Sequence, residues 1–183
     1  MHFWGKHMNV STTTGLPDAQ VLYERLLNAV REMIEPLPRE QVHLVGILSG
    51  GAWLAEQMHK DLALDSAMGS LNISFYRDDF DRIGLHTQTT PSDISFEVAG
   101  AHIILVDDVL YTGRTIRAAM NELFDYGRPA SIRLVVLADR AQRQLPIQAD
   151  YAAWTVPPDE QGNLVLERLA HGRFSLTLEH EAH

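Results

Sequence analysis

Cysteine is absent from the 183 residues of this chain, which excludes disulfide bonds and thiolate metal sites. No uninterrupted apolar run approaches the ~20 residues that a membrane-spanning helix needs, and the first residues lack the long apolar core of a secretory signal peptide. We therefore expect a soluble, cytoplasmic protein without a membrane partner. Basic residues are also few, and the formal net charge of -9 argues against avid nucleic-acid binding, which depends on neutralising phosphates.

The residues that are present fit one globular domain. A hydrophobic content of 45% with 21% charged residues is ordinary for a folded protein, and the length suits a single domain. Residues 1–16 include a Ser-Thr run without apolar periodicity, so we expect them to form a flexible or vector-derived tail. Residues 17–183 are expected to form the domain.

Apolar strands alternate with helices along the chain. Helical spacing of apolar residues predicts helices between Asp18 and Pro36, over 52–62 and over 116–123. Compact apolar runs predict strands over 42–48, 71–76, 101–106 and 132–137. This order predicts an α/β fold with a mainly parallel sheet flanked by helices, in which ligands bind at the carboxyl ends of the strands. Three further short strands, over 151–156, 164–169 and 174–178, are expected to form a small subdomain over that site.

The strongest motif is residues 103–115, where four apolar residues lead directly into Asp107 and Asp108 and then into a glycine turn that opens a helix. Paired carboxylates are suited to accept hydrogen bonds from the hydroxyls of a ribose. Residues 112–115 offer backbone N–H groups, two hydroxyls and a guanidinium at a helix N-terminus, where an anion is favoured. The run therefore predicts a ribose 5-phosphate site. The simpler interpretation is that the aspartates begin a turn and Thr115 caps the next helix.

Two other segments fall near the same predicted edge of the sheet. Leu48-Ser49-Gly50-Gly51 forms a second glycine turn between a strand and a helix. Residues 77–97 are polar and lack a sustained period, and a loop of that length inside a compact domain is usually functional.

Residues 103–115 resemble the phosphoribosyl pyrophosphate (PRPP) motif of the type I phosphoribosyltransferases. Together with residues 75–79 and 137–151, they are similar to the PyrR family of bifunctional pyrimidine regulatory proteins and uracil phosphoribosyltransferases. The resemblance covers most of residues 17–178. It implies the type I phosphoribosyltransferase fold, with a small hood subdomain.

The resemblance also implies roles for individual residues. Asp107 and Asp108 would be the catalytic residues and would contact the ribose hydroxyls. The 5-phosphate would be bound by Tyr111, Thr112, Gly113, Arg114 and Thr115. The pyrophosphate loop would be Leu48, Ser49, Gly50 and Gly51, with a cis peptide bond at Leu48-Ser49. The hood and the base pocket would include Arg77, Arg140 and Leu164. Mg²⁺ would enter bound to PRPP, without a metal site made by the protein alone.

The implied reaction joins uracil to the ribose of PRPP and releases pyrophosphate, with a possible role in regulating pyrimidine biosynthesis. Expected ligands are PRPP, uracil, and UMP or UTP, and the resemblance suggests a homodimer or homotetramer. Tyr111 stands where the 6-oxopurine branch has an acid that serves the purine ring, so tyrosine favours a pyrimidine base. Alternatively, this tyrosine simply packs over the loop.

Departures from the family pattern keep two alternatives open. Leu48 and Gly50 occupy positions that usually carry basic residues, which favours a uridine-nucleotide-sensing regulator with weak or no catalysis. The second alternative is a purine phosphoribosyltransferase. RNA binding is expected to be weak, because the basic surface that the family uses retains only Arg31 and Arg143. Uncharged side chains stand at its other positions: Pro36, Gln142, Gln148 and Trp154.

Overall fold

The computed structural model describes residues 15–73 and 90–180. Arg77, the end of the predicted strand 71–76 and most of the predicted hood loop lie outside these ranges. The helices are α1 (Ala19–Ile34), α2 (Gly50–Asp61) and α4 (Arg114–Tyr126), with short 3-10 turns at Arg39–Gln41 and Ala170–Gly172. The strands are β1 (Val42–Ile47), β2 (Gly69–Leu71), β3 (His102–Leu110), β4 (Ser131–Asp139), β5 (Tyr151–Thr155), β6 (Asn163–Arg168) and β7 (Phe174–Glu179).

Helix α1 begins where the sequence predicted it. The carboxylate of Asp18 accepts hydrogen bonds from the backbone N–H groups of Gln20 and Val21, at 2.7 and 3.3 Å. These bonds satisfy two donors that the first helical turn leaves without an internal partner. The apolar stripe of the helix is buried, and it consists of Leu22, Leu26, Val30 and Ile34. Capping and apolar spacing together explain the helix.

Five strands form one parallel sheet in the order β2-β1-β3-β4-β5. The fold prediction of a mainly parallel sheet flanked by helices is confirmed. Strand β5 belongs to this sheet, so the expectation that residues 151–156 join a separate subdomain was wrong. The reason lies in Asp150, whose backbone N–H donates to the carbonyl of Leu134 and whose carboxylate accepts from the N–H of Leu134, at 2.8 and 2.7 Å. This double contact ties the start of β5 to β4.

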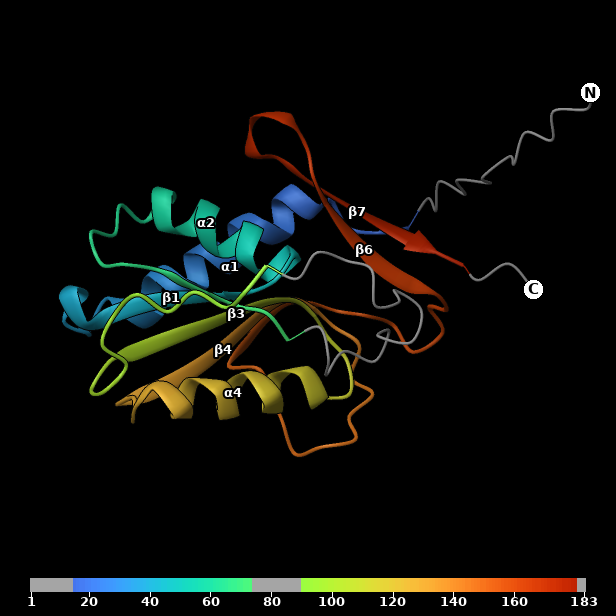
Figure 1. The fold of residues 1–183 in the computed structure, drawn as a ribbon. Helices are drawn as coiled ribbons and strands as arrows, with labels where there is room; N and C mark the ends of the chain where they lie inside the picture. The colour runs from blue at the N-terminus through green and yellow to red at the C-terminus, as the bar shows by residue number, and fades with distance from the viewer. Residues whose placement is uncertain (1–14, 74–89, 181–183) are drawn as a thin grey trace, which may run out of the picture.

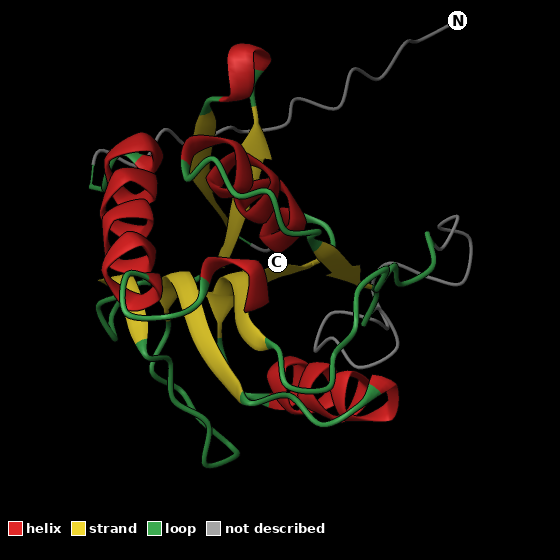
Figure 2. Cartoon of the chain, turned by 90° about the vertical axis from the view of Figure 1, so that its left-hand side faces the viewer, coloured by secondary structure: helices red, strands yellow, loops and turns green. Residues whose placement is uncertain are grey.

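Helices cover both faces of the sheet, and each face has its own apolar core. Helices α1 and α2 lie on one face and α4 on the other (Figure 1), and the view turned by 90° shows the same arrangement (Figure 2). Alternate residues of β3 divide between the two cores: Ile104 and Val106 pack on the α1 and α2 side, while Ile103 and Leu105 pack on the α4 side. A strand buried on both faces reads as a continuous apolar run, which is why β3 was visible in the sequence.

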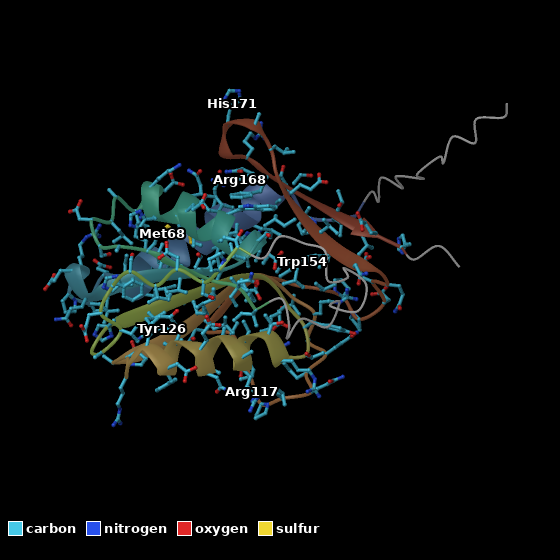
Figure 3. All side chains as sticks on the ribbon, viewed as in Figure 1. Met68, Arg117, Tyr126, Trp154, Arg168 and His171 are labelled. Atoms are coloured by element: carbon cyan, nitrogen blue, oxygen red, sulfur yellow. The ribbon has the colours of Figure 1, made fainter. Side chains whose placement is uncertain are left out.

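Strands β6 and β7 form an antiparallel hairpin that docks on α1 and α2. The ring of Phe174 lies 5.3 Å from that of Tyr23 on α1, between centroids. Arg168 makes an ion pair of 2.8 Å with Glu56 on α2. Arg168 lies between the hairpin and the helices in Figure 3, and His171 marks the hairpin tip. Within the described ranges, no helix is long and apolar enough to cross a membrane.

Candidate active site

The chain leaves the carboxyl ends of β1 and β3 toward opposite faces of the sheet. Pairing of β1 with β3 stops at Gly46 and Val106, whereas β3 continues beside β4 as far as Leu110 and Asp139. After β1 the chain turns into α2 on one face, and after β3 it turns into α4 on the opposite face. The strand order also reverses here, since β2 lies on the far side of β1. Open parallel sheets bind ligands at such a switch point.

Asp107 and Asp108 lie at this position, but within β3. The strand predicted to end at residue 106 was too short, and the interpretation that the aspartates begin a turn was wrong, because β4 continues to pair with β3 beyond the apolar run. Asp107 is only 3% exposed. Its Oδ1 accepts from the N–H of Asp108 at 2.9 Å, and Oδ1 of Asp108 accepts from the N–H of Val109 at 2.8 Å. These bonds fix both carboxylates beyond the point where β1 ends.

Two glycines bring the start of α2 against the aspartates. A Cβ built on Gly51 would lie 2.4 Å from the carbonyl oxygen of Val106, and one on Gly50 would lie 2.4 Å from Oδ2 of Asp108. Only residues without a side chain permit this approach. The peptide bond Leu48-Ser49 is cis, as expected. The predicted pyrophosphate loop therefore lies beside the predicted ribose contacts.

The turn after β3 leads into α4 through a left-handed glycine. Gly113 has a φ of 95° and is the residue before the helix, so the alternative in which Thr115 caps α4 was wrong. The hydroxyl of Thr112, a buried residue, accepts from the N–H of Arg114 at 3.3 Å. Helix α4 therefore begins at Arg114, and the backbone donors and helix dipole at its start favour an anion.

Arg140 contacts both the turn after β3 and the chain that leads into the hairpin of β6 and β7. Its guanidinium carbon lies 5.1 Å from the centroid of the Tyr111 ring, an arrangement that permits a cation–π interaction. The same guanidinium donates to the carbonyls of Gly162 and Glu160. Leu164 lies on β6, two residues beyond Gly162, and pairs with Leu178 in the hairpin. Arg140 and Tyr111 are therefore brought together, and the chain leading to Leu164 is held next to them.

Arg143 has a role that the sequence analysis missed. It was considered only as part of a basic surface, but its guanidinium donates to the carbonyl of Tyr111 at 2.9 Å and to that of Ile147 at 2.6 Å. It also forms an ion pair of 2.6 Å with Asp139. No pattern in the sequence distinguishes an arginine that bonds backbone carbonyls from one that faces water.

Comparisons with known proteins agree with this geometry. The family model "Phosphoribosyl transferase domain" matches residues 20–166. A "Bifunctional protein PyrR" from Nitrosococcus oceani is 47% identical over 161 residues, covering 86% of this chain and 90% of that protein. One of the same name from Ralstonia nicotianae is 46% identical over 165 residues, covering 88% and 94%. This chain belongs to the PyrR family of phosphoribosyltransferases.

Solved structures of more distantly related proteins share this fold. A hypoxanthine-guanine phosphoribosyltransferase from Bacillus anthracis superimposes with a TM-score of 0.64 at 18% identity, covering 82% of this chain and 85% of the other. An HGPRT-ase from Leishmania tarentolae gives 0.58 at 18% identity, covering 80% and 79%. At such identity the likeness shows the shared fold and carries no argument about the base. Family and fold, as the sequence predicted them, are confirmed.

The geometry bears on the basic residue that the family resemblance led us to expect at position 50. A basic side chain at position 50 would begin with a Cβ that overlaps Asp108. In this chain the carboxylate occupies that space. The glycine and the present position of Asp108 are therefore mutually dependent.

Proposed function

We propose that this chain is a uracil phosphoribosyltransferase that forms UMP and pyrophosphate from uracil and PRPP. The observation that carries the proposal is the contact between the start of α2 and the end of β3: Gly50 and Gly51 lie against Asp108 and Val106, where β1 and β3 stop pairing. The start of α2 offers backbone donors, and the end of β3 offers paired carboxylates. A ribose that carries a pyrophosphate needs both in one place.

The reaction is a substitution at the anomeric carbon of the ribose. The bond from this carbon to the pyrophosphate oxygen breaks, and its electron pair leaves with pyrophosphate. The N1 nitrogen of uracil forms the new bond and loses its proton to solvent. Positive charge develops on the sugar in the transition state, and the carboxylates of Asp107 and Asp108 act by placement and electrostatic stabilisation. They form no covalent intermediate.

The 5-phosphate would be bound by the turn that opens α4. Gly113 adopts its left-handed conformation there, and the helix begins at Arg114. The first helical turn has backbone N–H groups that point along the axis toward an incoming anion. Residues 112–115 would bind the phosphate with these groups and with their side chains.

Mg²⁺ would arrive as part of the substrate. Among the described residues no group of three or more His, Asp or Glu side chains is placed to hold a metal ion. Magnesium prefers phosphate oxygens and water, with one or two carboxylates. Asp107 and Asp108 near the end of β3 fit such a limited contribution, and the metal would neutralise charge on the leaving group.

The base would lie near Tyr111 and Arg140. The Tyr111 ring is 40% exposed, with Arg140 against it. A pyrimidine fits this proposal because Tyr111 replaces the acid that would serve a purine ring. The carbonyls of Glu160 and Gly162 accept hydrogen bonds from Arg140, which fixes its guanidinium beside Tyr111.

A base-panel assay tests the proposal. Purified protein with PRPP and Mg²⁺ should convert uracil to UMP and pyrophosphate, and hypoxanthine or guanine should neither react nor compete. An Asp107→Asn, Asp108→Asn double variant should lose turnover. Asp125→Asn is the matched control, because it removes an exposed carboxylate from α4. Turnover of a purine base would replace the proposal with the purine alternative.

A second candidate is a regulator that senses uridine nucleotides with weak or no catalysis. Leu48 favours it, because an apolar residue stands in the predicted pyrophosphate loop where the family usually has a basic one. This candidate predicts UMP or UTP binding by calorimetry without turnover. Failure to bind either nucleotide would exclude it.

Partners and location complete the proposal. We place residues 17–183 in the cytoplasm as one catalytic unit that assembles into a homodimer or homotetramer, which sedimentation would test. RNA binding would be weak, since the net charge is -9 and the guanidinium of Arg143 is bonded within the protein. Titration with a pyrimidine-operon leader RNA at two salt concentrations would measure it.

A further inference from the structure

Arg143 donates hydrogen bonds to three residues, through two backbone carbonyls and one carboxylate. Nη1 donates to the carbonyl of Tyr111 at 2.9 Å, Nε donates to the carbonyl of Ile147 at 2.6 Å, and Nη2 donates to Oδ2 of Asp139 at 2.6 Å. The side chain is 21% exposed. A planar guanidinium has donors in all three directions at once, whereas a lysine ammonium on a flexible stem cannot reproduce this geometry.

The segment held by Arg143 lies along the turn that follows β3. The N–H groups of Gln144 and Leu145 both donate to the carbonyl of Thr112, at 2.9 and 3.2 Å. Nε of Arg114 donates to the side-chain oxygen of Gln144 at 2.9 Å. A Cβ placed on Gly113 would lie 3.0 Å from the Cβ of Ile147. Residues 140–147 therefore form the outer support of the turn.

We propose that Arg143 is a positioning residue, which holds the turn of residues 111–113 in the conformation that receives the 5-phosphate of PRPP. The inference rests on the proposed function. Arg143 acts through the carbonyl of Tyr111 and does not touch the substrate. Pairing of β1 with β3 ends at Val106, before the turn, so this pairing does not hold the turn itself. If the turn is already ordered before PRPP binds, binding does not lose the free energy that ordering the turn would cost.

The ion pair with Asp139 separates this role from that of a surface cation. Asp139 neutralises the guanidinium, and its other oxygen, Oδ1, accepts from the N–H of Ala141 at 2.7 Å. A cation kept for an external phosphate would gain from the loss of this carboxylate. A positioning residue would lose its orientation instead. Substitution of Asp139 therefore has opposite consequences under the two roles.

The first experiment compares Arg143→Lys with Arg39→Lys. Arg39 is a matched control, because its guanidinium also donates to backbone carbonyls, those of Leu62 and Ala63 at 2.8 and 3.3 Å, away from the turn. Arg143→Lys should raise the KM for PRPP about tenfold or more, because small displacements of binding groups are costly. The KM for uracil and kcat should stay within about twofold. Arg39→Lys should change none of the three.

The second readout needs neither ligand nor turnover. In ligand-free protein, hydrogen exchange should become faster in Arg143→Lys at the amides of Gln144 and Leu145, whose acceptor is the carbonyl of Thr112. The same amides should be unchanged in Arg39→Lys. Asp139→Asn should raise the KM for PRPP in the same direction as Arg143→Lys. The double variant should add little to Arg143→Lys, as expected for residues of one network.

The outcomes separate the inference from the proposed function. An unchanged KM for PRPP in Arg143→Lys, beside an active parent protein, overturns the inference even if thermal stability falls. A KM lowered by Asp139→Asn overturns it as well. If the parent protein neither binds nor turns over PRPP, the proposed function fails. Faster hydrogen exchange confined to the turn in Arg143→Lys would then still support the positioning role of Arg143. Hydrogen exchange that is equally faster throughout the protein would overturn it.

Discussion

Gly50 and Asp108 share a space that holds only one side chain: a Cβ on Gly50 would lie 2.4 Å from Oδ2 and 2.8 Å from Cγ of the aspartate. Gly50 begins α2 after β1, Asp108 lies in β3, and the two meet where β1 and β3 stop pairing. The position of a proposed catalytic carboxylate thus depends on a residue with no functional group. Gly51, the next residue, meets backbone at a similar distance, 2.4 Å from the carbonyl oxygen of Val106.

Alanine substitutions at these two glycines should therefore have different effects. Gly50→Ala displaces a side chain, so it should lower kcat/KM by about tenfold or more with a small loss of stability. Gly51→Ala presses on the backbone of β3 and should lower the free energy of unfolding by about 1–3 kcal/mol. Urea unfolding and steady-state kinetics measure both quantities. Gly15→Ala is the control, because a Cβ there meets nothing within 4 Å. Equal effects at both positions would contradict the geometry.

Single substitutions of Asp107 and Asp108 should also have different effects on activity and stability. Asp108→Asn should lower kcat by about 10²–10³-fold, as expected when one preorganised electrostatic contact is lost, with a change in unfolding free energy below about 1 kcal/mol. Asp107→Asn should lose activity and also about 1–3 kcal/mol of stability, because Asp107 is 3% exposed and its carboxylate bonds the backbone of Asp108. Thermal unfolding beside an activity assay provides the test. A stable Asp107→Asn protein with normal turnover would rule out the assignment.

A lysine at position 48 should restore the charge that the family pattern usually has there. Leu48→Lys should tighten product inhibition by pyrophosphate about tenfold, since charge-assisted hydrogen bonds contribute about 1.5–3 kcal/mol. Leu169→Lys adds the same charge at a leucine of the hairpin that is 47% exposed, and it should leave inhibition unchanged. Equal tightening in both variants would indicate a general charge effect and not a pyrophosphate loop.

Alkaline pH should destabilise the protein through Tyr23. Burial, followed by the hydrogen bond of 2.5 Å that its hydroxyl donates to Asp61, raises the pKa of Tyr23 well above its usual value. A raised pKa in the folded state means that the stabilisation is complete below the unfolded pKa of about 10 and is lost progressively as the pH rises above it. Tyr23→Phe cannot ionise. At pH 8 the free energy of unfolding of Tyr23→Phe should be lower than that of the parent protein. This difference, measured by urea unfolding from pH 8 to 11, should shrink above about pH 10. A constant difference would contradict this.

The sequence by itself determined the features that depend on residues near one another in the chain. Apolar spacing and Asp18 predicted α1, and the buried run before Asp107 predicted the strand of the motif. Residues 103–115 place carboxylates, a glycine turn and a helix start in one short span, so their proximity needs no tertiary information. The family and the fold followed from this span and two others.

Only the tertiary structure decided how distant segments meet. It placed β5 in the main sheet, extended β3 through both aspartates and put Gly50 against Asp108. It also showed that the guanidinium of Arg143, which the sequence analysis assigned to a basic surface, donates to the carbonyl of Tyr111. The physical reason is the same in each case. A backbone hydrogen bond or a close contact depends on which neighbour the fold supplies, and neither polarity nor spacing along the chain specifies that neighbour.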